Sequence, residues 1–248
     1  MPETGPAGSL SAPAIVTQGR EAAEAYDLPG PGQNFHHEMN RWGSGGVLAL
    51  LAEVPEAGTA FYGLPYAKDA HESVLLRWGG DRLAEFDWNF ATPRMFPPEM
   101  ACFDADGDGE DELIAACYYG SGTGVSIYEL HVVEKNPDGT LTDYTLPEGL
   151  WQEQISALLR LDELGGRYFL SLGRELVELV PDFPQITEGE QSPSAGWIAE
   201  FLFLPEESII VLRGAADCWH TTYYVANYSA EVCYEDGIFT LWNFHLYS

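Results

Sequence analysis

The chain has 248 residues, of which 46% are hydrophobic and 13% aromatic, so it has enough apolar material for a core and is not a wholly disordered chain. Its 11 Lys and Arg against 39 Asp and Glu leave a formal net charge of −28, which argues against nucleic acids and anionic lipid surfaces as partners. No apolar run approaches the ~18 residues of a membrane-spanning helix, and the start lacks the basic and apolar regions of a signal peptide. Cations, basic partners and neutral ligands such as sugars remain as the classes of partner that this charge allows.

Composition divides the chain into a tail and a body. Residues 1–33 are dense in Pro, Gly, Ala, Ser and Glu, and such a segment cannot bury enough surface to order itself. From about residue 47, apolar, β-branched and aromatic residues fall in short runs between turn signals, which is typical of strands. We therefore expect a disordered linker or tail at 1–33 and a single all-β domain at 34–248.

Turn residues between the short runs predict a series of hairpins. The predicted hairpins join 73–78 to 82–88, 125–134 to 140–146, 155–161 to 167–172, and 230–234 to 238–244. A further strand is expected at 175–180. No segment of this body shows a 3.6-residue apolar period over three turns, so no long helix is predicted.

The predicted strands fall into four groups, at 47–90, 98–147, 152–185 and 197–247, which repeat at about 45–50 residues. Four-stranded units at such a period are typical of propeller blades. A β-sandwich produces a similar series of strands. The prediction is an all-β fold, a propeller-like array of antiparallel four-stranded units, with a β-sandwich as the alternative.

The four cysteines form two pairs with equal spacing, Cys102 with Cys117 and Cys218 with Cys233. Neither pair is a CxxC motif, which argues against a zinc ribbon or a thioredoxin-type site. Two local disulfides would fit if each pair flanked a hairpin, whereas buried free thiols are the common alternative. Both interpretations remain open.

The sharpest chemical signal is the segment 103–113, which reads FDADGDGEDEL. Asp104, Asp106 and Asp108 alternate with small residues, so their carboxylates can converge on one point. Calcium takes roughly 6–8 oxygen ligands from carboxylates, carbonyls and water. We expect Glu110 to offer its backbone carbonyl and Glu112 to supply the last carboxylate or hold a water. The segment therefore predicts a structural Ca²⁺ site.

An EF-hand is the obvious alternative for this loop. It requires a bidentate Glu at the twelfth position, where this chain has Ala115. It also requires flanking helices, whereas residues 113–119 have the composition of a strand. We therefore expect an EF-like loop between two strands.

The motif in 103–113 resembles the calcium loop of FG-GAP/VCBS-type repeats, DxDGDGxxDL, with Glu112 where that family usually has Asp. Residues 119–132 are similar to the stretch that follows this loop in secreted lipoproteins and sensor ectodomains of Firmicutes. The resemblance covers 98–147, about one repeat. It implies extracellular propeller blades with structural calcium, and an anchor to the cell surface through a segment upstream of the chain.

Aromatic residues are the other candidates for ligand binding. Trp219, Tyr223 and Tyr224 form a candidate sugar-binding platform, because exposed aromatic rings can stack on sugars. His131 lies in strand-like sequence, where a hydrogen-bonded histidine is the usual outcome. We expect a non-enzymatic, extracytoplasmic binding or sensing module whose ligand is a carbohydrate or a protein. A glycoside-hydrolase-like enzyme on a β scaffold and a purely structural spacer domain are the alternatives.

Overall fold

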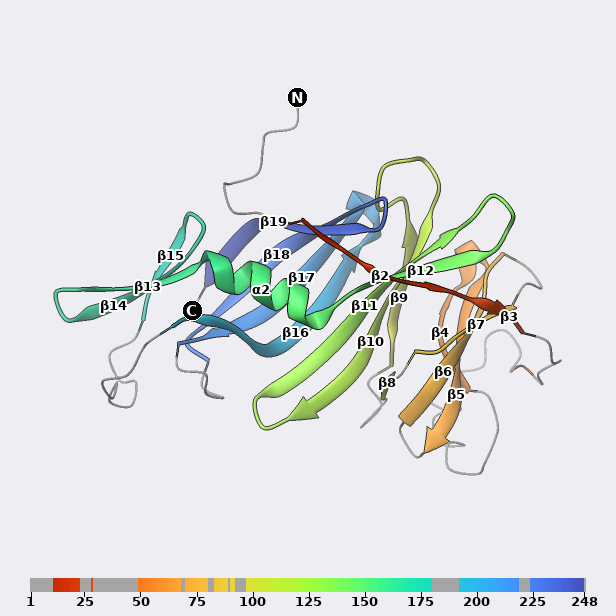
Figure 1. Cartoon of the computed structure of the whole chain (residues 1–248), viewed down its shortest axis with the longest axis horizontal. Coiled ribbons are helices and arrows are strands. Elements are labelled where there is room, and N and C mark those ends of the chain that lie inside the picture. The colour runs from red at the N-terminus through yellow and green to blue at the C-terminus, as the bar shows by residue number, and fades with distance from the viewer. Residues whose placement is uncertain are drawn as a thin grey trace. The chain divides into compact units, whose positions relative to one another are not determined.

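The computed structural model describes residues 11–22, 28, 49–67, 70–79, 83–88, 90–91, 97–179, 192–218 and 224–247. Contacts divide the chain into two compact units. Unit 1 comprises Met1–Ala14, Ser121–Ile127 and Leu146–Ser248, and unit 2 comprises Ile15–Gly120 and Tyr128–Thr145. Strands predominate in the described part of each unit, which confirms the all-β prediction (Figure 1). The single domain predicted for 34–248 stays a prediction.

Unit 2 contains two sheets. In the first, the strand order is β3-β7-β6-β5-β4, and β8 also pairs with β6. Its strands are β3 (Arg20–Glu21), β4 (Ala49–Val54), β5 (Thr59–Ala67), β6 (Ala70–Arg77), β7 (Leu83–Phe86) and β8 (Phe90–Ala91), with the short 3-10 helix η1 (Pro55–Ala57) between β4 and β5. In the second, the order is β9-β10-β11-β12-β2. Its strands are β2 (Ile15–Gln18), β9 (Glu99–Phe103), β10 (Glu112–Gly122), β11 (Val125–Lys135) and β12 (Leu141–Leu146).

The two sheets of unit 2 share one hydrophobic core. Alternate residues of β10, such as Leu113 and Cys117, lie in the same buried cluster as Phe61 of β5 and Leu76 of β6. This alternation follows from the two-residue period of a strand, which places every second side chain on one face. None of the sheets in the described residues closes on itself.

Unit 1 contains a sheet in the order β1-β19-β18-β17-β16, and β11 joins β16 through a parallel pairing of Ser126 with Ile198. Its strands are β1 (Ser11–Pro13), β16 (Ser194–Leu204), β17 (Ile209–Asp217), β18 (Ala226–Glu235) and β19 (Ile238–Tyr247), with the 3-10 helix η3 (Pro205–Glu207) between β16 and β17. A smaller sheet consists of β13 (Leu159–Leu164), β14 (Arg167–Leu172) and β15 (Glu175–Glu178). Helix α2 (Glu148–Leu158) packs on β16 (Figure 1).

Several hairpin predictions are confirmed by antiparallel pairing of β6 with β7, β13 with β14, and β18 with β19. Between β18 and β19, Asp236 and Gly237 have φ values of 49° and 76°. Two successive residues with positive φ are what a type I′ turn requires, and its twist matches that of the flanking strands. The local sequence therefore determines this connection.

The strand predicted to begin at residue 155 is wrong in its first part, because α2 continues to Leu158. Trp151, Gln154 and Ile155 are buried and share one face of the helix by their spacing. Gln154 interrupts the apolar stripe, and the helix has only 11 residues. A periodicity test over three turns therefore does not detect it.

The prediction of a disordered tail is wrong for residues 11–21, which form β1, β2 and β3. β1 pairs with β19 in unit 1, whereas β2 pairs with β12 and β3 with β7 in unit 2. Ile15 and Val16 are more than half exposed, so the segment is ordered by backbone pairing at sheet edges and little by its own burial. Most of the remaining tail lies outside the described residues.

The four cysteines are free thiols, which settles the alternatives that their spacing leaves open. Burial raises the pKa of Cys102 to about 11 and that of Cys218 to about 12, so neither is a reactive thiolate at neutral pH. No helix in the described part of the chain is both long and apolar enough to span a membrane.

Candidate functional site

The acidic loop of unit 2 connects β9 to β10, whose antiparallel register places Phe103 opposite Glu112. The loop is therefore closed at its base by paired strands, as expected for an EF-like loop between strands. One carboxylate oxygen from each of Asp104, Asp106 and Asp108 lies within 4.8 Å of the others. These three predicted ligands are thus brought together.

Backbone amides of the loop hold Asp104 in place. Its Oδ1 accepts a hydrogen bond from the N–H of Gly107 at 2.7 Å, and its Oδ2 accepts one from the N–H of Gly109 at 3.1 Å. These glycines have φ values of 82° and 96°, a region that other residues rarely adopt. The glycines therefore let the chain curl around the first aspartate.

The two following aspartates are held in the same way. Oδ1 of Asp106 accepts the N–H of Asp108 at 3.0 Å, and Oδ1 of Asp108 accepts the N–H of Glu110 at 2.8 Å. The side chain of Glu110 is exposed, and the role of its backbone carbonyl as a ligand stays a prediction. Because each bond leaves further lone pairs on the carboxylate, the aspartates retain oxygens for a cation.

Glu112 lies at the start of β10 and is only 4% exposed. Its Oε2 accepts the N–H of Ala105 at 2.7 Å. The pKa of Glu112 is raised to about 7, chiefly by burial. The hydrogen bond from Ala105 lowers this pKa, and the nearby charges of the three aspartates raise it further. Glu112 is not among the three residues whose ligand atoms converge, so its role as a ligand stays a prediction.

The three converging donors are carboxylate oxygens, which are ligands for Ca²⁺ and Mg²⁺ and not for soft metals. Mutual repulsion of the three aspartates would be relieved by a divalent cation. The residues present therefore fit the ion implied by the resemblance. Asp104, Asp106 and Asp108 would hold it, with Glu110 and Glu112 completing the set.

A second site in unit 2 was not identified from the sequence. It is a pocket of about 310 Å³, and a cluster of polar side chains forms one wall. Asp143 of β12 is 1% exposed, and its Oδ2 accepts hydrogen bonds from Trp88 Nε1 at 2.8 Å, Thr17 Oγ1 at 3.0 Å and Thr145 Oγ1 at 3.2 Å. Both of its oxygens also lie 3.2 Å from His131 Nδ1. Protein donors therefore replace water around this buried carboxylate.

His131 of β11 is held between a carboxylate and an aromatic ring. Its imidazole stacks on Trp88 with ring centroids 3.8 Å apart. Burial alone would lower the pKa of His131, but the carboxylates of Asp143 and Glu129 outweigh it and raise the pKa to about 9. The imidazole is therefore protonated at neutral pH. The expectation of a hydrogen-bonded histidine is confirmed.

The other ring nitrogen of His131 is incompletely satisfied. Nε2 lies 3.4 Å from Glu129 Oε2, yet it is buried and makes no hydrogen bond to any described residue. Glu129 itself has a side chain that is 31% exposed and lines the pocket. Nε2 is therefore buried beside the carboxylate of Glu129 and is not accessible to a ligand in the pocket.

A second ion-pair group lines the same pocket. Arg20 of β3 donates from Nε and Nη2 to the two carboxylate oxygens of Glu85 at 3.1 and 2.8 Å, and its Nη2 lies 3.5 Å from Asp87 Oδ1. The pairing follows from the register, which places Arg20 opposite Glu85. Each of the two cationic side chains in the pocket therefore has two carboxylate neighbours.

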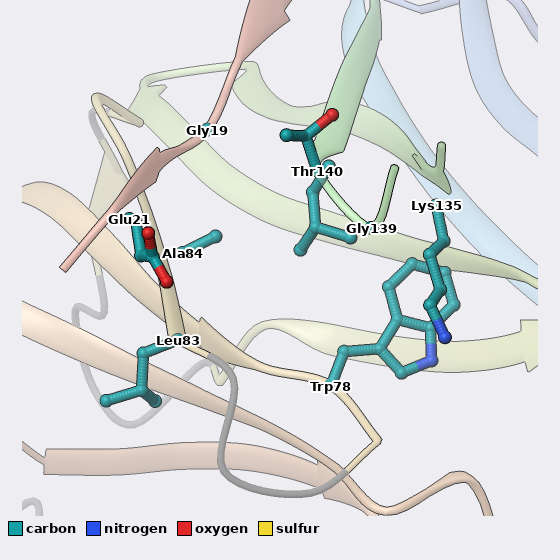
Figure 2. Close-up of a pocket in the computed structure, with 9 residues that line it drawn as sticks. Gly19, Glu21, Trp78, Leu83, Ala84, Lys135, Gly139 and Thr140 are labelled. Carbon is teal, nitrogen blue, oxygen red and sulfur yellow. The ribbon is translucent and has the colours of Figure 1, made fainter. Parts of the chain in front are cut away.

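A smaller pocket of about 90 Å³ is also present in unit 2. Figure 2 shows that its lining includes the aliphatic stem of Lys135, the indole of Trp78 and the side chain of Leu83. This volume is well below the roughly 300 Å³ at which ligand pockets begin. We do not assign it a ligand.

The predicted aromatic platform is described only at Tyr224, because Trp219 and Tyr223 lie outside the described residues. The Tyr224 hydroxyl donates to the carbonyl of Gly124 and accepts the N–H of Trp197. A Cβ at Gly196 would clash with the Tyr224 ring, so the ring packs tightly on the backbone there. Tyr224 has these structural contacts, and its role in ligand binding stays a prediction.

Comparisons with known proteins add no assignment. No family model, curated protein or solved structure matches the chain. The candidate sites therefore rest on their residues and geometry.

Proposed function

We propose that the chain is a calcium-stabilised, non-enzymatic binding or sensing module. The observation that carries this proposal is the convergence of ligand oxygens from Asp104, Asp106 and Asp108 within 4.8 Å, in a loop whose own amides hold the carboxylates. The ion has a structural role in this proposal, because all of its expected ligands come from one connection between paired strands. It would fix the hairpin of β9 and β10.

The proposed location and architecture are based on the resemblance of 98–147 to FG-GAP/VCBS-type repeats. We propose an extracytoplasmic location, with the chain anchored to the cell surface through an upstream segment, and a propeller-like relationship among its strand groups. The net charge of −28 supports a carbohydrate or a protein ligand and disfavours polyanions. This carbohydrate or protein ligand is distinct from the structural calcium ion.

Calcium is expected to raise the melting temperature of the protein, and chelation with EDTA is expected to lower it. A ligand that binds only the folded state adds about 2.7 kcal/mol at 100 times its dissociation constant. For a chain of this size, each kcal/mol shifts the melting temperature by roughly 2–4 °C. Differential scanning calorimetry with and without millimolar calcium measures the shift.

The variant Asp106→Ala should lose this calcium response, whereas Asp162→Ala, which removes an exposed aspartate on β13, should keep it. An equal response of both variants, or no shift in the wild type, would show that the loop does not bind calcium.

A further inference from the structure

We propose that the 310 Å³ pocket of unit 2 binds a neutral polyhydroxylated ligand such as a monosaccharide or a sugar unit of a glycan. The inference deepens the proposed binding function and rests on it. The pocket is distinct from the calcium loop, and none of its polar residues was a predicted site residue.

The charges of the pocket argue against an anionic ligand. Glu85, Asp87, Glu129 and Asp143 line it, against the cationic side chains of Arg20 and His131. Both cationic groups are neutralised by carboxylate neighbours at 2.8–3.5 Å. An anion would therefore meet an excess of negative charge, within a chain that is itself strongly acidic.

The donors of the pocket argue against a simple cation. The pocket's two cationic donors, Arg20 and His131, already lie 2.8–3.5 Å from all four carboxylates, so a further cation would have to displace them. A ligand that satisfies the pocket must therefore accept as well as donate.

A sugar hydroxyl does both, because it carries one donor and two acceptor lone pairs. A sugar hydroxyl could donate to the carboxylate of Glu129, whose side chain is 31% exposed and lines the pocket. The ion pair of Arg20 and Glu85 places a donor beside an acceptor in the same pocket. Donors and acceptors side by side match a polyol better than an ion or an apolar ligand.

An aromatic ring is available for the apolar face of a sugar. Tyr119 of β10 lines the pocket and is 54% exposed. It lies two residues beyond Cys117, and so shares the core-facing side of the strand. The ring is therefore placed where the hydrophobic core gives way to the polar wall, and an amphipathic ligand can contact both. The volume also suits a small ligand.

The test is calorimetric titration of the calcium-saturated protein with D-glucose, D-galactose, D-mannose and D-xylose, beside spermidine, glycine and citrate. We expect 1:1 binding of at least one neutral sugar and no comparable binding of the three charged compounds. Tyr119→Ala and Glu129→Gln should each weaken binding at least tenfold. Matched variants at exposed positions of unit 1, Tyr247→Ala and Glu163→Gln, should leave it unchanged.

The inference is overturned if none of the sugars binds, if a charged compound binds more tightly, or if Tyr119→Ala and Glu129→Gln bind as the wild type does. If the protein hydrolyses p-nitrophenyl glycosides and Glu129→Gln abolishes this activity, the binding proposal is wrong and the glycoside-hydrolase alternative holds. Calcium is titrated separately into EDTA-treated, dialysed protein. A protein that binds calcium and no sugar contradicts this inference alone, whereas one that binds sugar and no calcium contradicts the calcium proposal.

Discussion

Replacing Asp143 with alanine is expected to lower the free energy of unfolding by about 3–5 kcal/mol, the usual cost of removing one partner of a buried ion pair. The carboxylate is 1% exposed, and its loss leaves the protonated His131 buried without its main counter-charge. It also leaves the indole N–H of Trp88 and the hydroxyl of Thr17 without the acceptor that they use. Urea unfolding followed by tryptophan fluorescence measures the change.

Two further variants give this prediction its control. Asp143→Asn keeps the shape and an acceptor oxygen but removes the charge, so we expect a smaller loss than for alanine. Asp162→Ala on the exposed side of β13 should change stability by no more than about 0.5 kcal/mol. A loss below 1 kcal/mol for Asp143→Ala would mean that the buried pair is not formed.

Stability is also expected to fall as the pH rises from about 6.5 to about 9. Asp143 and Glu129 raise the pKa of His131 to about 9, above the ordinary value of about 6.5 that applies in the unfolded chain. Between these values the folded state binds more protons, so each unit of pH removes stability. The full contribution, about 3 kcal/mol, is present below pH 6.5 and is lost as the pH passes through 9.

The experiment compares urea unfolding of the wild type and of His131→Gln across this range, with calcium present so that the acidic loop is saturated. The charged groups facing the imidazole are Asp143 on β12 and Glu129 on β11, and the ion pairs of Arg20, Glu85 and Asp87 line the same pocket. An NMR titration of the imidazole gives an independent value. A midpoint near 6.5, or equal pH profiles for the two proteins, would contradict the prediction.

The parts of the fold that are determined by residues close together in the sequence could be predicted. Asp236 and Gly237 specify a tight turn, and their hairpin is present as predicted. β1 to β3 could not be predicted, because their order comes from pairing with β19, β12 and β7, and the composition of the tail carries no sign of those partners. Helix α2 was missed because a buried glutamine interrupts its short apolar stripe.

The two sites differ in the same way, because one is formed by residues close together in the sequence and the other by residues far apart. The acidic loop has its three converging aspartates within five residues, so spacing alone indicated it. The pocket around His131 brings Asp143 together with Trp88, 55 residues away, and with Thr17, 126 residues away. Only the local alternation of Glu129 and His131 on one face of a strand hinted at it, and that pattern is common in exposed strands.

The central claim is that the loop of Asp104, Asp106 and Asp108 binds one divalent cation. Isothermal titration of calcium into EDTA-treated, dialysed protein tests it most directly. We predict one site per chain, with binding abolished in Asp106→Ala and retained in Asp162→Ala. The absence of binding at millimolar calcium, or undiminished binding by Asp106→Ala, would contradict it.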